Sequence, residues 1–274
     1  MVTTQATAPD YRAIKDRQRQ TWASGDYSAV GSRIVLMAEQ LCDAADLRAG
    51  SRVVDVATGS GNAALAAARC GCEVTGIDYV PSLLEQGRAR AAVEGLEVTL
   101  LEGDAEALPL ADGSADAVIS VVGVMFAPDQ ERAAAELVRV CRPGGTIALA
   151  SWTPDGFIGG LLKTVGAHVP PPAGLRPPVL WGTEARLREL LGDDVASLDA
   201  RERTYVFRYP SADAFVDFFR TNYGPTLKAF AALDEAGRER FHEDLVSLVH
   251  GHDRLDGGPI AVPATYLETV AIRR

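Results

Sequence analysis

Residues 53–62, VVDVATGSGN, constrain the fold of this chain more than any other stretch. A β-branched run reaches a carboxylate at Asp55 and passes into a turn that holds Gly59 and Gly61. The helical run AALAAAR follows at once. A strand, a glycine turn and a helix in this order are typical of chains that bind part of a nucleotide at the turn. The stretch therefore predicts a nucleotide site and leaves open which cofactor is bound.

The same alternation of strand and helix continues along the next hundred residues. Buried strands are predicted at 51–57, 72–78, 97–103, 115–122 and 146–152. Helices are predicted between them at 62–69, at 81–95 and around 134–141. The pattern indicates βαβ units, and hence an α/β, Rossmann-like parallel sheet with helices on both faces. Ligands of such sheets bind at the carboxyl ends of the strands.

The chain changes character after residue 152. Gly159, Gly160 and the prolines between 170 and 178 predict a long non-helical loop over 153–180. A strand at 201–210, a helical insertion and a last strand then complete a seven-stranded, mostly parallel sheet with a helical cap. We expect a single domain over 1–274, made of a helical lid (1–45), a cofactor-binding core (46–152), a loop and strand (153–210), the cap (211–258) and the last strand (259–274).

Composition and charge indicate which kinds of binding partner do not suit this chain. The 274 residues are 47% hydrophobic, which is enough for one large buried core. The formal net charge of −10 disfavours nucleic acid and anionic membranes. No apolar run approaches the roughly 20 residues of a membrane span, and the polar N-terminal segment lacks the apolar core of a secretory signal, so we expect a cytoplasmic protein. Cys70 and Cys72 have one spacer residue and no second pair, so no metal site is expected.

Two cofactors fit the glycine turn equally well. Residues 59–64, GSGNAA, satisfy the G-x-G-x-x-A form of the dinucleotide fingerprint. Asp78 lies at the end of the second predicted strand, where a carboxylate can accept both hydroxyls of a ribose, as it would in a NAD-dependent oxidoreductase. These residues alone fit a NAD-dependent oxidoreductase and an enzyme that uses another nucleoside cofactor equally well.

Three further features favour S-adenosylmethionine. Asp55 lies four residues before Gly59, where its charge would repel a pyrophosphate but suits an ammonium beside a sulfonium. Asp104 and the small Ala105 follow the third predicted strand and suit an adenine ring. The fourth predicted strand ends in the apolar run 121–126, VVGVMF, where a methyl group would be presented.

The core from 46 to 152 resembles the class I S-adenosylmethionine-dependent methyltransferases, in particular the group with the ubiquinone and menaquinone C-methyltransferases. The motifs that carry the resemblance are VVDVATGSGN, VTGIDYVPSLL, EGDAEALPL and ELVRVCRPGGTIALASW. Ala57 stands where that family often has another glycine. The resemblance implies S-adenosylmethionine as methyl donor, S-adenosylhomocysteine as product, and a small-molecule acceptor. We expect a monomer or a homodimer.

The resemblance also implies roles for individual residues. The carbonyls of Ala57 and Gly59 would hold the methionine ammonium, and Asp55 would orient that ammonium or the loop. Asp78 would take the ribose hydroxyls and Asp104 the adenine, while Tyr11, Trp22 and Tyr27 are lid candidates, although Trp22 and Tyr27 suit a helix-packing pair equally. The full set of predicted cofactor residues is Tyr27, Asp55, Ala57, Thr58, Gly59, Asn62, Asp78, Tyr79, Asp104, Ala105, Glu106 and Val121.

The acceptor side is less constrained. Methyl transfer is an in-line displacement, so it requires positioning and exclusion of water more than a fixed catalytic triad. If a base is needed, His168 and Tyr223 are the candidates. The predicted substrate pocket, for which ordinary core is the alternative, consists of Met125, Phe126, Trp152, Trp181 and Phe219. We expect methylation of an O-, N- or C-nucleophile, for example on a secondary metabolite. The rivals are a NAD-dependent oxidoreductase and a non-catalytic S-adenosylmethionine-binding protein.

Overall fold

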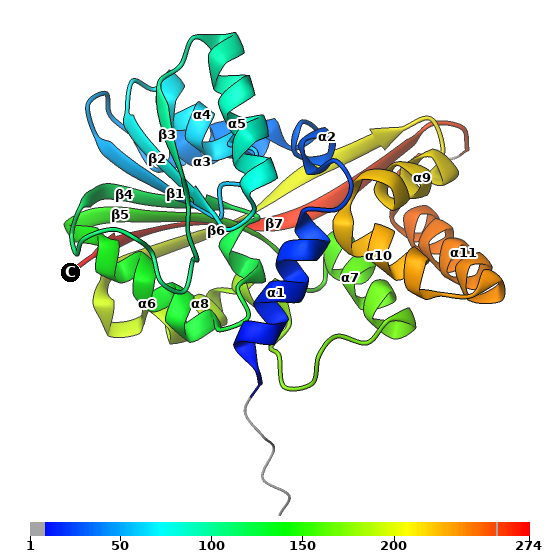
Figure 1. Cartoon of the computed structure of the whole chain (residues 1–274). Coiled ribbons are helices and arrows are strands. Elements are labelled where there is room, and N and C mark those ends of the chain that lie inside the picture. Colours follow the sequence, from blue (N-terminus) through cyan, green and yellow to red (C-terminus); the bar gives the residue numbers. More distant parts are fainter. Residues whose placement is uncertain (1–8, 256) are drawn as a thin grey trace, which may run out of the picture.

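A computed structural model describes residues 9–255 and 257–274 of the chain. Its centre is a seven-stranded sheet in the order β3-β2-β1-β4-β5-β7-β6 (Figure 1). The strands are β1 (Arg52–Val56), β2 (Glu73–Asp78), β3 (Val98–Glu102), β4 (Ala115–Val121), β5 (Cys141–Trp152), β6 (Val195–Tyr209) and β7 (Ile260–Arg273). Strand β7 is antiparallel to both of its neighbours, and the pairs from β3 to β5 are parallel. The predicted mostly parallel α/β sheet is confirmed.

Burial explains why the central segments form parallel strands. Four of the five residues of β1 are buried, and β4 is buried over most of its length. Strands that are covered on both faces read as continuous apolar runs, and such runs occur in the middle of parallel sheets. Strand order reverses between β1, which continues to β2, and β4 on its other side. A crevice therefore opens at the carboxyl ends of β1 and β4, where open α/β sheets bind ligands.

Helices cover both faces of the sheet and extend beyond one end of it. Figure 1 shows α3, α4 and α5 above the sheet, α6 and α8 below it, and α9 to α11 grouped to one side. Their bounds are α1 (Tyr11–Trp22), α2 (Tyr27–Gly31), α3 (Val35–Ala44), α4 (Asn62–Arg69), α5 (Pro81–Glu94), α6 (Gln130–Val140), α7 (Phe157–His168), α8 (Glu184–Leu191), α9 (Ala212–Asn222), α10 (Gly224–Ala232) and α11 (Glu235–His252). No described helix is both long and apolar enough to cross a bilayer.

Local sequence sets the ends of the core helices. Helix α5 begins at Pro81, whose fixed φ suits the first turn, and ends at Gly95, which adopts a left-handed conformation with φ of 66°. The side chain of Asp129 accepts a hydrogen bond from the Arg132 amide and so caps α6. These short-range signals lie in the sequence itself, and both ends of α5 were predicted from them.

The prediction of a non-helical loop over 153–180 is wrong in its first half, because α7 occupies Phe157–His168. Gly159 and Gly160 lower helix propensity, but here they permit close packing. A β-carbon on Gly159 would lie 2.2 Å from the Pro154 carbonyl oxygen, and one on Gly160 would lie 2.9 Å from Leu248 of α11. Tertiary packing therefore overrides local propensity in α7. The proline-rich part of the segment begins only after the helix.

The N-terminal helices meet the cap through two glycines. A β-carbon on Gly25, between α1 and α2, would lie 2.6 Å from the carbonyl oxygen of Asn222. A β-carbon on Gly224, at the start of α10, would lie 2.1 Å from the carbonyl oxygen of Thr21. Both positions leave no room for a side chain. Helices α1 and α2 therefore pack directly on α9 and α10, above the crevice at the strand ends.

Candidate active site

The turn after β1 holds its shape through left-handed residues. Ala57, Gly59 and Gly61 have φ values of 54°, 56° and 85°. Only glycine adopts this region without strain, so Ala57 costs conformational energy at this turn. The amide of Thr58 donates to the Ile77 carbonyl at 2.9 Å and ties the turn to β2. Gly61 is the N-cap of α4, and its neighbours Ser60 and Asn62 line the cleft described below.

Asp55 stabilises this turn from beneath. Its carboxylate accepts a hydrogen bond from the Thr58 hydroxyl and another, at 2.9 Å, from the Ala64 amide of α4. The side chain is 1% exposed and does not line the cleft described below. Burial raises the pKa of Asp55 to about 7, against the opposing effect of these two hydrogen bonds. Of the two roles predicted for Asp55, its contacts correspond to orientation of the loop.

Asp78 lies at the carboxyl end of β2 and borders the cleft directly. One carboxylate oxygen accepts from the Gly59 amide at 2.8 Å, and the other accepts from the Val80 amide at 2.9 Å. Burial raises the pKa of Asp78 to about 6, and the backbone hydrogen bonds lower it less than burial raises it. The carboxylate is therefore fixed in position, with further acceptor capacity for the hydroxyls of a ligand.

A lysine from the N-terminal helix joins the acidic residues after β3. Lys15 Nζ lies 2.6 Å from the Asp104 carboxylate and 2.8 Å from that of Glu106. Glu106 also accepts from the Asp129 amide at 2.8 Å, and it does not line the cleft. Asp104 does line it. The group of three charges thus attaches α1 to the edge of the cleft, and Glu106 holds that attachment rather than the ligand space.

The residues at the strand ends enclose a cleft of about 810 Å³, counted to include its open mouth. The predicted cofactor residues that line it are Tyr27, Ala57, Thr58, Gly59, Asn62, Asp78, Tyr79, Asp104, Ala105 and Val121. Asp55 and Glu106 do not line it, because both side chains are turned into hydrogen bonds with the surrounding loops.

Three lining residues come from one face of α1. Lys15 and Gln18 were not predicted as site residues, whereas Trp22 was a candidate for the lid. Their spacing of three and four residues places them on the same side of a helix, and this spacing is the signal by which the sequence could have revealed them. The Trp22 ring lies 4.9 Å from Phe126 and 5.6 Å from Tyr27, centroid to centroid. Tyr11, the other lid candidate on α1, does not line the cleft.

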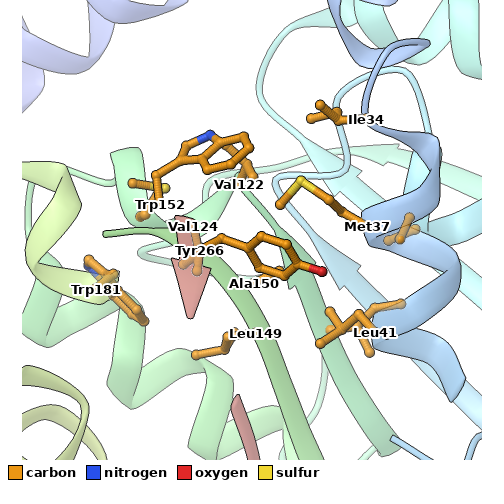
Figure 2. Packing of buried hydrophobic residues seen from close by; sticks show 14 of the residues in the cluster. Ile34, Met37, Leu41, Val122, Val124, Leu149, Ala150, Trp152, Trp181 and Tyr266 are labelled. Carbon is orange, nitrogen blue, oxygen red and sulfur yellow. The ribbon is translucent and has the colours of Figure 1, made fainter. Parts of the chain in front are cut away.

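A second, smaller and apolar compartment adjoins the cleft, with about 380 Å³ of empty space when its open side is included. The two spaces share Tyr27, Ile34, Val122 and Phe126. Of the residues predicted for the acceptor side, Phe126, Trp152, Phe219 and Tyr223 line this compartment. Figure 2 shows the Trp152 ring beside Val122, with Ile34 on the facing segment. The compartment thus begins at the end of β4, where the sequence led us to expect the methyl group.

The other predicted acceptor-side residues lie elsewhere. Met125 and Trp181 are buried in the hydrophobic core and line neither space; in Figure 2, Trp181 lies apart from Val122 and Ile34. His168 ends α7, where its Nε2 lies 2.7 Å from Asp244 of α11. Its ring also packs on Phe241, so the imidazole serves contact between helices. These placements correct the predicted acceptor-side roles of Met125, Trp181 and His168. The position of a residue after a strand in the sequence does not determine the direction in which its side chain points.

The cleft suits a nucleoside that carries a positive tail. Among the described residues, no lysine or arginine contributes to the pKa of Asp55 or Asp78, so both buried carboxylates lack a cationic neighbour. A positive group at the turn above Asp55 would be attracted by that carboxylate without contacting it, and ribose hydroxyls would donate directly to Asp78. The β-carbon of any residue replacing Gly123 would lie 2.4 Å from the Ala57 carbonyl oxygen, so the loops after β1 and β4 pack closely around this position.

Comparison with known proteins agrees with this geometry. Residues 54–149 match a family model described as a methyltransferase domain. The chain is 45% identical over 237 residues to an uncharacterized protein of Mycobacterium tuberculosis, covering 85% of this chain and 86% of the relative. It is 38% identical over 142 residues to a demethylmenaquinone methyltransferase of Thermus thermophilus, covering 47% of this chain and 64% of that enzyme.

Solved structures show the same fold at low identity. The YcgJ protein of Bacillus subtilis has a TM-score of 0.62 at 20% identity and covers 86% of this chain and 97% of its own. A Haemonchus contortus N-methyltransferase, solved with S-adenosylhomocysteine, has a TM-score of 0.56 at 14% identity and covers 86% of this chain and 52% of its own. The family model and the similarity to a demethylmenaquinone methyltransferase, together with the fold, define a methyltransferase. The chain belongs to the class I S-adenosylmethionine-dependent methyltransferases.

The buried carboxylate at Asp78 predicts how ligand affinity depends on pH. Its pKa of about 6 in the free protein is raised from the ordinary value, so the neutral acid prevails below pH 6 and a ligand that needs the carboxylate must displace a proton. We expect the affinity for S-adenosylhomocysteine to be constant above about pH 7 and to fall about tenfold per pH unit well below 6. Calorimetry in buffers of different ionisation enthalpy should detect the released proton.

The Asp78→Asn variant shows which of the two carboxylates causes the change in affinity with pH. A pH dependence that disappears in Asp78→Asn belongs to Asp78, whereas one that persists belongs to Asp55, whose pKa is also raised by burial. An affinity that stays flat from pH 5 to 8 would contradict the prediction.

Proposed function

We propose that this enzyme transfers the methyl group of S-adenosylmethionine to a small-molecule acceptor by in-line displacement. The observation that carries the proposal is the direct junction, at the end of β4, between a cleft bordered by Lys15, Asp78 and Asp104 and an apolar compartment with no charged lining residue among those described. Two adjoining spaces, of which only one is bordered by charged side chains of the described chain, suit two reactants that meet at one point. The net charge of −10 further supports a small molecule over nucleic acid or an anionic membrane.

Each wall of the cleft has a part in binding the donor. Asp78 would accept the ribose hydroxyls, and Asp104 with Ala105 would receive the adenine. The carbonyls of Ala57 and Gly59 would hold the methionine ammonium, on a turn that Asp55 keeps in shape. S-adenosylmethionine, when bound, supplies an electrophilic methyl group. Val121 and Val122 would border that group, because Val121 ends β4 and lines the cleft, and Val122 follows it and lines both spaces.

Besides binding the donor, the protein must keep water from the reacting atoms and orient the acceptor. Trp22, Tyr27 and Phe126 form an aromatic cluster over the junction, and such a cover keeps water from the reacting atoms. No histidine, carboxylate or amine among the described residues lines the apolar compartment. The acceptor would therefore bring a nucleophile that needs no strong base from the protein, whether oxygen, nitrogen or carbon.

A pair of titrations tests the proposal. We expect S-adenosylhomocysteine to bind with micromolar affinity by calorimetry and NAD to show no binding under the same conditions. The distinction arises because Asp55 lies beneath the turn that a pyrophosphate would approach, and its charge would repel that group. Binding of NAD with no binding of S-adenosylhomocysteine would overturn the proposal.

A further inference from the structure

The apolar compartment has an unusual composition. Six of its eleven lining residues are aromatic, and among the described residues none that lines it carries a formal charge. Its walls come from β5, β6, α7 and α9 as well as from the lid. Aromatic walls favour flat ring systems through edge-to-face and offset contacts. A charged molecule would lose its hydration there without gaining a partner charge, which is strongly unfavourable.

Two residues bring a polar group to this compartment without also lining the cofactor cleft: Trp152, with an indole N–H that can only donate, and Tyr223, with a hydroxyl that can donate and accept. Tyr223 lies at the junction of α9 and α10, immediately before Gly224, whose tight contact with the Thr21 carbonyl fixes the backbone. Its ring centroid lies 5.7 Å from Trp22 and 5.5 Å from Phe219. The ring is thus held between the lid and the cap, in a single position.

The hydroxyl of Tyr223 makes no hydrogen bond with another described residue. Burial raises the pKa of Tyr223 well above its ordinary value, and the neighbouring Tyr27 raises it further. The group is therefore a neutral phenol, which donates one hydrogen bond and accepts others but does not act as a base. Buried tyrosine hydroxyls usually find a partner. A fixed, unpaired donor on an apolar wall is therefore available to a ligand.

We propose that Tyr223 selects and orients an uncharged aromatic acceptor through a hydrogen bond to the single polar substituent of that acceptor. The inference rests on the proposed function and specifies its substrate class. The aromatic walls hold the ring system, and the Tyr223 hydroxyl fixes its rotation relative to the junction at Val122. The absence of lining charges excludes carboxylate and ammonium analogues of the same shape.

A matched set of probes tests this inference on the full chain saturated with S-adenosylhomocysteine. Naphthol, naphthalene and naphthoate share a ring system and differ only in the substituent. By equilibrium dialysis we expect naphthol to bind about fivefold more tightly than naphthalene, since a net hydrogen bond is worth about 1 kcal/mol. We expect naphthoate to bind at least about tenfold more weakly than naphthol, because its charge is buried without a partner.

Three variants assign the effect to the hydroxyl. Tyr223→Phe should abolish the preference for naphthol over naphthalene and leave S-adenosylhomocysteine affinity unchanged. Tyr209→Phe is the matched control, because it removes a buried tyrosine hydroxyl that has no partner among the described residues, and Tyr209 lines neither space. Leu161→Trp should fill the compartment and abolish naphthol binding, again with unchanged affinity for S-adenosylhomocysteine.

The outcomes separate this inference from the proposed function. Failure of S-adenosylhomocysteine to bind would overturn the proposed function. If it binds, then naphthoate binding as tightly as naphthol, an unchanged preference in Tyr223→Phe, or displacement of S-adenosylhomocysteine by naphthol would each overturn the inference alone.

Discussion

Replacing Asp78 with asparagine is expected to weaken S-adenosylhomocysteine binding about 100-fold. The carboxylate accepts hydrogen bonds from the Gly59 and Val80 amides, and an amide side chain would present N–H to one of these donors. It would also lose the charge that strengthens hydrogen bonds from ribose hydroxyls. Two charge-assisted bonds at about 1.5 kcal/mol each amount to about 3 kcal/mol, which corresponds to two orders of magnitude in affinity.

Calorimetry of Asp78→Asn and of a control on the same strand measures this effect. Glu73 begins β2 at the edge opposite the cleft, and it is exposed. Glu73→Gln removes the same charge from the same strand and should leave affinity unchanged. Equal losses in both variants would attribute the effect to net charge, and an unchanged affinity in Asp78→Asn would remove Asp78 from the cofactor site.

A methyl group added at Gly123 is expected to lower the free energy of unfolding by about 3 kcal/mol, at the upper end of the cost of overpacking. The new β-carbon would lie 2.4 Å from the Ala57 carbonyl oxygen and 2.9 Å from the Ala57 β-carbon. The Ala57 carbonyl oxygen belongs to the backbone and the Ala57 β-carbon is attached to it. Neither atom can rotate away as the end of a long side chain would, so the contacts cannot be relieved without moving the turn. Gly123→Ala should also weaken S-adenosylhomocysteine binding, because the Ala57 carbonyl is a proposed ligand of the methionine ammonium.

Chemical denaturation of Gly123→Ala and Gly251→Ala provides the comparison. Gly251 lies in α11 with nothing within 4 Å of its added β-carbon, and its φ is not left-handed. Alanine there should raise stability slightly, by up to about 1 kcal/mol, because it favours the helix. A Gly123→Ala protein that is as stable as the parent would show that the loops after β1 and β4 can separate without cost.

The parts of the fold that were predicted correctly depend on short-range patterns. The apolar run of β1, the glycine turn and the Pro81 and Gly95 ends of α5 each follow from a few adjacent residues. Helix α7 was missed because its glycines lower propensity locally, while the compensation comes from Leu248, far along the chain. Local patterns do not contain that contact.

The same distinction applies to the site. Asp78 and Asp104 line the cleft, and the sequence indicates this because each lies at or just after the end of a strand. His168 was misplaced, since its partner Asp244 lies in another helix that only the tertiary structure brings near. Lys15 was not considered because its carboxylate partners lie about ninety residues away, although its helical spacing with Trp22 was visible. The direction of a buried side chain depends on such distant contacts.

The division into two compartments has a consequence for how enzymes of this kind diverge. Seven residues line the apolar compartment without lining the cleft: Val30, Trp152, Ile158, Leu161, Phe207, Phe219 and Tyr223. All of them lie outside residues 54–149, the part that matches the methyltransferase family model. Mutations can therefore accumulate in the acceptor walls while the donor site stays under separate selection. A lineage can acquire a new substrate without passing through an ancestor that has lost its methyl donor.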